Sequence, residues 1–237
     1  MPLFKIVSAD CAAAMRVALP ALATVLERVL KTPGERMASV RECRYPQDLH
    51  SHTTFSQYDS SVVPEQTPEL IARVKHASVV GISDHFEHIV ENAYDRYVDR
   101  LRSLNVLVGT EVDGASSVDQ AASLEFDYYI YHCYDRLADY RAAERLLATD
   151  KPVIIAHPNA LHTNLERVPP ECLVEINNRY VWQTDWLAFY GRYKGRFRYV
   201  ISSDAHQPTW LAQSVARRAA AELDIRETLL KDIVAPA

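Results

Sequence analysis

Eight side chains of types that commonly bind metal ions are distributed along this 237-residue chain in short motifs. They are His50, His52, His85, Glu111, His132, His157, Asp204 and His206. Nearly every one ends a short apolar run rich in β-branched residues, which is typical of a buried strand. Side chains two residues apart in a strand point the same way, so an HxH and a DxH motif each present two ligands in one direction. Metal-dependent chemistry is therefore the leading interpretation.

A single histidine at a strand end is usually a structural hydrogen-bonding residue. Eight suitable side chains at successive strand ends are poorly explained in that way. Imidazole-rich sets with a few carboxylates suit Zn, Mn or Fe, whereas Mg and Ca sites are richer in oxygen ligands. The sequence therefore predicts divalent transition-metal ions as cofactors.

From residue 45 onward, short apolar runs alternate with amphipathic stretches. Strands are predicted over residues 47–50, 79–83, 106–109, 128–131, 153–156, 173–176 and 199–202. Helices are predicted over residues 68–77, 93–104, 137–148, 181–193 and 209–223. Such alternation predicts an α/β fold with parallel strands and right-handed helical crossovers. If the strands close into a barrel, the candidate ligands lie together at its C-terminal mouth.

The N-terminal region carries one amphipathic stripe with 4-3-4-3 spacing that stops before Pro33-Gly34. The stripe consists of Met15, Leu19, Leu22, Leu26 and Val29. We expect residues 1–44 to form a helical extension packed on a barrel of residues 45–237, the whole being one structural domain. A dimer seam is the less favoured alternative, because the stripe is too short to sustain a coiled coil.

Composition excludes several classes of function. The net charge of −5 and the lack of a basic stripe argue against a long nucleic-acid track, which needs clustered Lys and Arg. Charged residues interrupt the apolar stretch of residues 12–30, so we expect neither a membrane anchor nor a signal peptide. The four cysteines contain no CxxC pair, which favours reduced thiols and a cytoplasmic protein.

The motifs DLHSHTTFS, SDHFEH, GTEVD, IAHPN and SSDAH, together with the isolated His132, resemble a known family. In order and approximate spacing they are similar to the motifs of the PHP (polymerase and histidinol phosphatase) family of metal-dependent phosphoesterases. The resemblance covers residues 48–206, and the ordered set is far more specific than any one motif. It implies a distorted seven-stranded (β/α)7 barrel, similar to a TIM barrel, with two to three metal ions at its mouth.

The resemblance also implies a role for each ligand. His50, His52, Glu111 and Asp204 would hold one ion, Glu111 with His132 and His157 a second, and His85 with His206 part of a third. Glu111 would bridge two ions, and Glu111 and Asp204 would be the catalytic carboxylates. Many family members have an Asp or His seven or eight residues after the first histidine of HxH. Gln57 and Tyr58 stand there in this chain, although Asp59 is next in line.

Three further residues are candidates for supporting roles. Asp48 and Asp84 precede ligand histidines and are expected to orient an imidazole by a hydrogen bond. Arg179 follows the strand predicted at residues 173–176, where it would either grip a substrate phosphate or form a surface salt bridge.

The function expected from these residues is hydrolysis of a small phosphorylated metabolite by a metal-activated hydroxide. The alternatives are a phosphodiesterase or nuclease acting on short oligonucleotides, an amidohydrolase, and a metal-binding regulatory module without turnover. Glu111 in place of a bridging lysine argues against the amidohydrolase. The substrate, the native metal and the oligomeric state do not follow from the sequence.

Overall fold

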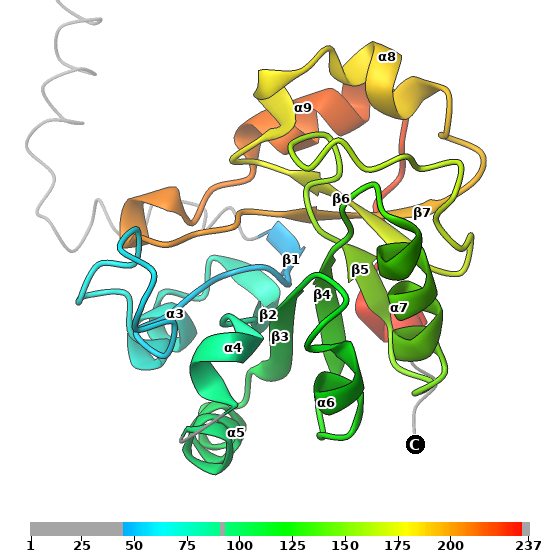
Figure 1. Ribbon diagram of the computed structural model, residues 1–237. Helices are drawn as coiled ribbons and strands as arrows, with labels where there is room; N and C mark the ends of the chain where they lie inside the picture. The colour runs from blue at the N-terminus through cyan, green and yellow to red at the C-terminus, as the bar shows by residue number, and fades with distance from the viewer. Residues whose placement is uncertain (1–44, 91–92, 234–237) are drawn as a thin grey trace, which may run out of the picture. The chain divides into compact units, whose positions relative to one another are not determined.

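In the computed structural model, residues 45–90 and 93–233 are described, and they contain seven strands (Figure 1). The strands are β1 (Tyr45–Asp48), β2 (Ala77–Ile82), β3 (Leu107–Asp113), β4 (Tyr128–His132), β5 (Val153–Ile155), β6 (Leu173–Asn177) and β7 (Arg198–Ser202). Neighbouring strands are parallel and follow one another in sequence order. The expected fold class, a distorted (β/α)7 barrel, is confirmed. The helix and extension expected over residues 1–44 lie outside the described residues.

The barrel is joined between its first and last strands at the C-terminal mouth. There the backbone N–H of Asp204 donates to the carbonyl of His50 at 2.8 Å, and that of His52 donates to the carbonyl of Ala205 at 2.9 Å. Ser51 and Ala205 form a parallel bridge at the same place. The segments that carry the HxH and DxH motifs are therefore fixed to each other by main-chain hydrogen bonds.

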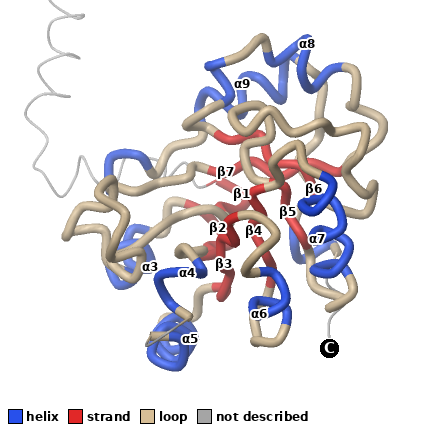
Figure 2. Tube along the Cα trace, viewed as in Figure 1, coloured by secondary structure: helices blue, strands red, loops and turns tan. Residues whose placement is uncertain are grey.

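Helices surround the strands and connect most of them (Figure 2). They are α3 (Pro68–Val74), α4 (Phe86–Ile89), α5 (Tyr94–Ser103), α6 (Val118–Ala122), α7 (Leu137–Leu147), α8 (Trp186–Gly191) and α9 (Ser214–Glu222), with 3-10 turns η1 (Val181–Gln183), η2 (Pro208–Trp210) and η3 (Leu230–Asp232). The short helices α4 and α6 were not expected from the sequence. The described chain has no helix between β5 and β6, so one of the expected β-α units is a β-loop unit. Within the described ranges, no helix has the length and apolar character needed to cross a membrane.

Two of the long helices predicted from the sequence are each divided in the structure. The stretch at residues 181–193 splits because Thr184 is extended and Asp185 begins a new helix, accepting a hydrogen bond from the N–H of Ala188 at 3.1 Å. The stretch at residues 209–223 splits into η2 and α9, with an irregular segment between them. Both divisions occur near the mouth of the barrel, where they shape its rim.

The strands separate two apolar cores. Side chains that face the barrel interior form the smaller core, which η3 closes with Leu230; they include Leu49, Tyr128, Ile130, Ile154, Leu173 and Val200. Alternate residues such as Tyr129, Tyr131, Ile155 and Val174 point outward and pack with the helices. Along each strand, inward and outward positions therefore alternate with the period of two expected for a pleated strand.

Tyr128 fills the barrel interior beside two glycines. A Cβ atom at Gly81 on β2 or at Gly109 on β3 would come closer than 3.0 Å to the Tyr128 side chain. The phenol crosses these strands and donates a hydrogen bond to the carbonyl of Leu49 at 2.6 Å. Glycine is required at both positions because the ring occupies the space of a side chain.

Candidate metal centre

The inward-facing positions of three strands change from apolar to polar toward the mouth. On β3 Gly109 is followed two residues later by Glu111, on β4 Ile130 by His132, and on β6 Leu173 by Glu175. Because residues two apart share a face, each strand delivers its polar group directly above the apolar barrel core. The sequence prediction ended β3 at residue 109, whereas the strand continues through Asp113 and Glu111 lies within it.

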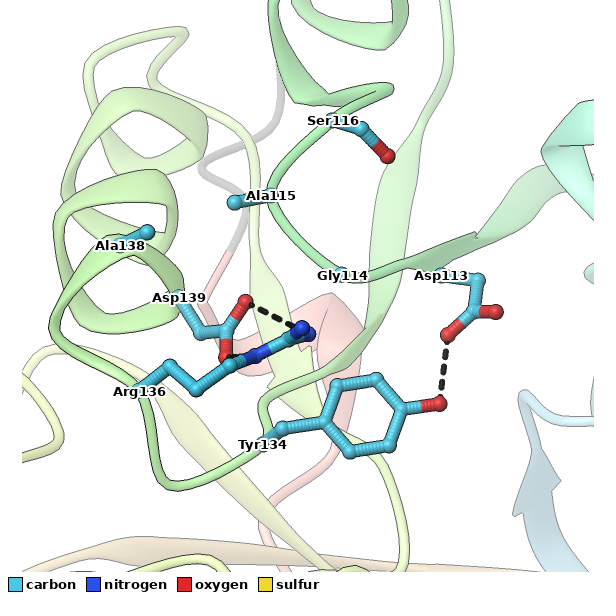
Figure 3. Close-up of a pocket in the computed structure, with 8 residues that line it drawn as sticks. All are labelled: Asp113, Gly114, Ala115, Ser116, Tyr134, Arg136, Ala138 and Asp139. Carbon is cyan, nitrogen blue, oxygen red and sulfur yellow. Dashed lines mark hydrogen bonds and ion pairs between the residues drawn. The ribbon is translucent and has the colours of Figure 1, made fainter.

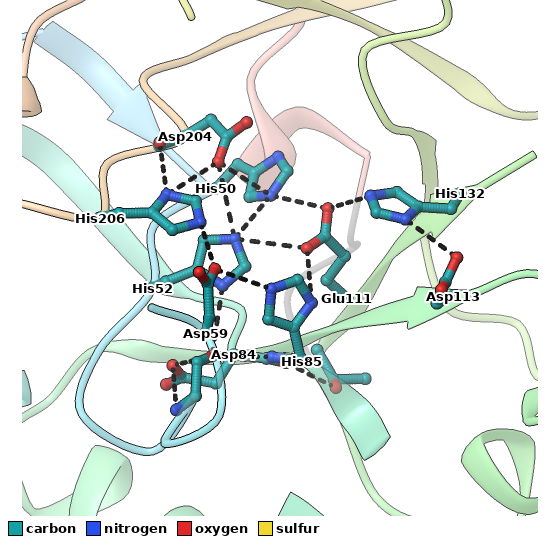
Figure 4. Close-up of polar contacts among 12 residues, drawn as sticks. His50, His52, Asp59, Asp84, His85, Glu111, Asp113, His132, Asp204 and His206 are labelled. Atoms are coloured by element: carbon teal, nitrogen blue, oxygen red, sulfur yellow. Dashed lines mark hydrogen bonds and ion pairs between the residues drawn. The ribbon is translucent and has the colours of Figure 1, made fainter. Parts of the chain in front are cut away.

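Glu111 lies at the centre of the mouth, and its side chain is only 2% exposed (Figure 4). Its Oε1 is 3.0 Å from Nε2 of His50 and 2.6 Å from Nε2 of His132. Its Oε2 is 3.1 Å from Nδ1 of His85 and 3.3 Å from Nε2 of His52. One carboxylate thus faces four imidazoles supplied by three separate motifs.

The ligand-type atoms form three overlapping groups, each with its atoms within 4.8 Å of one another. The groups are His50, His52 and Glu111; Glu111, His132 and His157; and His52, His85 and His206. Oδ1 of Asp204 lies 3.7 Å and 3.6 Å from Nε2 of His50 and His52. The structure therefore brings all eight candidate residues together, and Glu111 and His52 each belong to two groups.

The nitrogen and oxygen atoms of the candidate ligands point toward shared positions inside the cluster. Glu111 Oε1 is buried close to two imidazole nitrogens, yet among the described residues it has no hydrogen-bond partner. Nε2 of His132 lies 3.1 Å from Nε2 of His157, and Nε2 of His50 lies 3.1 Å from Nε2 of His52. When the proton of each ring is on Nδ1, the two Nε2 lone pairs of each pair face each other and neither nitrogen can donate. A buried set of converging lone pairs fits divalent cations.

Glu175 orients the ligands from beneath. Its Oε1 is 2.8 Å from Nδ1 of His50, while its Oε2 accepts from the backbone N–H of His157 at 2.7 Å and from the amide of Asn177 at 2.9 Å. Burial raises the pKa of Glu175, but the neighbouring His50 outweighs burial and lowers this pKa to about 2. An ionised Glu175 therefore fixes the proton of His50 on Nδ1 and leaves Nε2 free to bind a metal.

Asp113 makes the equivalent contact to another ligand. Its Oδ1 lies 3.2 Å from Nδ1 of His132 and accepts a hydrogen bond from the Tyr134 hydroxyl at 2.7 Å. The hydrogen bond with His132 lowers the pKa of Asp113 to about 2, although burial opposes it. Neither Asp113 nor Glu175 was expected in this role. Strand alternation could have identified both residues, since each lies two residues after an inward-facing position of its strand.

Asp48 and Asp84 were expected to orient ligand histidines, but their hydrogen bonds go to other groups. Asp48 accepts from the backbone N–H of Ser203 at 3.0 Å and pairs with His76 at 2.8 Å. Asp84 accepts from the backbone N–H of Thr53 at 2.6 Å and from Ser56 Oγ at 2.6 Å. These carboxylates hold the backbone of the motif segments, because a strand end must satisfy its free N–H groups.

The loop that Asp84 holds delivers Asp59 to the third group. Oδ2 of Asp59 lies 3.3 Å from Nε2 of His85 and 2.9 Å from Nε2 of His206. Gln57 and Tyr58 are exposed instead, with Tyr58 75% accessible. The carboxylate near the third group is therefore one residue later than the positions that the family resemblance indicated.

Neighbouring carboxylates raise the pKa values of two candidate ligand histidines. Burial lowers the pKa of His132, but Glu111 and Asp113 outweigh it and raise this pKa to about 10. Burial also lowers the pKa of His50, and Glu175, Asp204 and Glu111 raise it well above its ordinary value. Metal binding must displace these protons, so affinity for a metal falls as the pH falls.

Two of the candidate ligands have left-handed backbone conformations. The φ angle is +54° at Asp204 and +23° at His157, values that non-glycine residues rarely adopt. Each is held through its backbone N–H, which donates to the carbonyl of His50 from Asp204 and to the side-chain carboxylate of Glu175 from His157. Such strain costs about 1–3 kcal/mol per residue and persists where the surrounding structure enforces it.

A cavity of about 390 Å³, the metal-centre cavity, opens above the cluster. Besides the candidate ligands it is lined by Leu161, Arg179, Tyr180 and Gln183. Nη1 of Arg179 is 3.3 Å from both ring nitrogens of His206 and 3.7 Å from Oδ1 of Asp204. A donor in the plane of the ring cannot make an aligned bond to both nitrogens, so Nη1 lies over the face of the His206 ring. Arg179 therefore faces the cluster rather than forming a surface salt bridge.

A larger cavity of about 580 Å³, the acidic cavity, is lined by Asp113 and by residues of the segments that follow β3 and β4 (Figure 3). Its charged walls are Asp113, Arg136 and Asp139. Arg136 is bound to Asp139 through its Nε at 2.8 Å, and the Tyr134 hydroxyl is bound to Asp113. The charged groups of this cavity are thus already paired with neighbours, whereas the candidate metal ligands gather at the smaller cavity.

Comparison of the sequence with models of known protein families gives no match, and comparison with curated proteins gives none either. What can be concluded about function therefore comes from the motifs and from the geometry that they form.

Proposed function

We propose that this protein is a metal-dependent phosphoesterase of the PHP family that hydrolyses a small phosphate monoester. The observation that carries the proposal is the sharing of the buried Glu111 between two groups of imidazoles, beside a cavity lined by Arg179. A bridging carboxylate suits a pair of ions, and a guanidinium over the same cavity suits an anionic substrate.

The residues assigned to each ion are based on the three groups, with Asp204 added to the first and Asp59 in place of the shared His52 in the third. His50, His52, Glu111 and Asp204 would hold the first ion, and Glu111, His132 and His157 the second. His85, His206 and Asp59 would hold the third. Ions of Zn, Mn or Fe bound in this way lower the pKa of water and offset charge on a phosphoryl group.

The protein's own side chains have three tasks in the proposed reaction. Arg179 holds phosphoryl oxygens with its free N–H donors, Glu175 fixes the ring of His50, and Asp113 fixes that of His132. The overall reaction forms a bond from water oxygen to phosphorus and breaks the bond from phosphorus to the leaving oxygen. One proton of the water goes to the leaving alcohol, and the other stays with inorganic phosphate.

A small substrate is favoured by the size and charge of the site. The metal-centre cavity of about 390 Å³ is near the lower end of the range for ligand pockets, which is ~300–1,000 Å³. The net charge of −5 provides little attraction for long nucleic acids. We therefore propose a compact phosphorylated metabolite as the substrate.

The test is hydrolysis by protein loaded with Mn or Zn of p-nitrophenyl phosphate, bis-p-nitrophenyl phosphate, a short oligonucleotide and an anilide. The monoester should be hydrolysed fastest. Glu111→Gln should lower the rate by at least ~100-fold, the upper end of the range for losing a partner of a metal ligand, because Glu111 is itself a proposed ligand. Asp119→Asn is the control, since that carboxylate is 79% exposed and pairs with Arg145 on the surface.

Each alternative function has its own outcome in this assay. Faster cleavage of the diester or oligonucleotide would establish a phosphodiesterase, and cleavage of the anilide alone an amidohydrolase. Tight metal binding without turnover of any substrate would identify a regulatory module.

A further inference from the structure

A third cavity, of about 330 Å³, lies on the other side of Arg179 from the metal centre. Trp182 of η1 and Trp210 of η2 line it together with Ser203, which directly precedes Asp204. We call it the tryptophan cavity. Because Arg179 lines both this cavity and the metal-centre cavity, a ligand held by Arg179 can extend from one into the other.

The two indoles differ in how far they are already packed. The ring of Trp210 lies 6.1 Å from that of His206, and the guanidinium carbon of Arg179 lies 5.1 Å from the Trp210 ring centroid. Trp182, by contrast, is 60% exposed. Aromatic side chains are usually stabilised by burial, which the Trp182 indole lacks. A ligand that covers this indole would bury it and bind more tightly as a result.

Arg179 is also held in place by aromatic contacts. Its guanidinium carbon is 5.1 Å from the ring centroid of Tyr180 as well as from that of Trp210. Two such cation-π contacts limit the rotamers of a long side chain, so the boundary between the two cavities has a defined geometry.

The acidic cavity is the competing place for the rest of a substrate. Its charged walls, two carboxylates and one guanidinium, sum to a negative charge, whereas Arg179 is the charged side chain that lines the tryptophan cavity. A phosphate ester is an anion and is repelled by the former and attracted by the latter. Charge and aromatic surface therefore favour the same cavity.

We propose that the tryptophan cavity binds the leaving group of the substrate, and that this group is a planar aromatic or heteroaromatic ring. The proposal rests on the proposed phosphoesterase function, with the phosphoryl group beside Arg179 at the metal centre. Trp182 is a specificity-determining residue that stacks on the ring, and Trp210 forms the inner wall.

The first experiment measures binding without turnover. Benzylphosphonate and cyclohexylmethylphosphonate carry the same charge and similar bulk, but only the first has a flat π surface. Metal-loaded protein should bind benzylphosphonate at least about five-fold more tightly, as measured by calorimetry and by quenching of tryptophan fluorescence. Trp182→Ala should weaken binding of benzylphosphonate about five-fold more than that of its saturated partner and so remove the preference.

Trp186→Phe is the matched control. Trp186 lies four residues from Trp182 and hydrogen-bonds Glu222 through its ring nitrogen at 3.1 Å, outside the lining of the tryptophan cavity. This variant should keep the preference of the wild type. Equal affinities for the two phosphonates, or a preference that survives Trp182→Ala, would overturn the proposal.

A second experiment separates the failure of this proposal from failure of the proposed function. It compares hydrolysis of benzyl phosphate and cyclohexylmethyl phosphate, whose leaving groups are both primary alcohols. Discrimination between the phosphonates without hydrolysis of either ester would uphold the aromatic site and refute the phosphoesterase. Equal hydrolysis of both esters with equal phosphonate binding would uphold the phosphoesterase and refute the aromatic site.

Discussion

Replacing Glu175 by Gln tests the metal centre through a residue that is not itself a proposed ligand. The carboxylate accepts three hydrogen bonds, and an amide of the same shape can accept only with its oxygen. If that oxygen faces His50, the NH₂ group faces the N–H of His157 and the amide of Asn177, both donors. If the amide oxygen instead faces those two donors, the NH₂ group faces Nδ1 of His50.

The second orientation forces the wrong tautomer on His50. Its proton moves to Nε2, the nitrogen that lies 3.0 Å from Glu111 and would bind the metal. Loss of such a partner typically lowers metal affinity about 10- to 100-fold, which is roughly 1.4 to 2.8 kcal/mol. We expect this range for zinc in a competition titration against a chromophoric chelator.

The metal-free form of the same variant should also lose a pH-dependent part of its stability. The pKa of Glu175 falls from 4.5 to about 2 on folding, so its stabilisation is present above about pH 4.5 and is lost as the pH falls toward 2. This shift is worth about 3 kcal/mol. The ion pair between Glu175 and His50 also raises the pKa of His50, so this stabilisation belongs to the pair as a whole. Urea unfolding between pH 3 and pH 7 should therefore be flatter for Glu175→Gln.

Glu227→Gln is the control for these measurements. Glu227 is a largely buried carboxylate whose side chain is 8% exposed. It pairs with Arg217 at a distance of 3.0 Å, and neither residue is a candidate ligand. Its replacement should change stability without changing metal affinity. Zinc binding by Glu175→Gln within two-fold of the wild type would refute the proposed orientation of His50.

Four further predictions concern other parts of the molecule. Glu111→Gln should remove at least one equivalent of metal per chain by elemental analysis, because a neutral amide cannot bridge two cations; unchanged stoichiometry would exclude a bridge. Asp59→Asn should make one ion more sensitive to mild chelation and leave the other ions in place, and equal sensitivity of all ions would contradict the third group. Gly109→Ala should lower the free energy of unfolding by more than about 3 kcal/mol or prevent folding, because its Cβ would overlap a buried phenol. A Cβ atom at Gly195 would have nothing within 4 Å, so the free energy of unfolding of Gly195→Ala should stay within about 0.5 kcal/mol of the wild type. Similar losses of stability in both glycine variants would show that the Tyr128 ring can move. Burial raises the pKa of the Cys133 thiol from 9.0 to about 12, so its stabilisation is present below pH 9 and is lost as the pH rises toward 12. Native protein at pH 8.5 should leave this thiol unmodified by iodoacetamide in peptide mass spectrometry, and rapid labelling would show that the barrel opens there.

The sequence determined the strands and the set of candidate ligands. Strand spacing and alternation reflect local chemistry, because β-branched runs form strands and residues two apart share a face. The HxH and DxH motifs carried enough information to predict two candidate ligands each, and the seven other predicted residues gather with Glu111 at one mouth. The order of the motifs was sufficient to predict a parallel barrel with the candidate ligands at one mouth.

The ends of elements depended on contacts that sequence patterns do not report. The helix predicted through residues 181–193 is broken at Asp185, whose side chain caps a new helix. Strand β3 runs through Glu111 because β4 pairs with it as far as His132. Apolar periodicity is too coarse to place such boundaries, which are decided by individual hydrogen bonds.

Only the tertiary structure decided which groups support the ligands. Asp48 and Asp84 are adjacent to the motifs in sequence, yet they bind backbone N–H groups, while Glu175 and Asp113 orient His50 and His132. Glu175 lies 125 residues from His50 along the chain. Asp59 reaches the third group only because Asp84 holds the intervening loop. Local sequence fixes which way a side chain points from its strand, but closure of the barrel fixes which side chains meet.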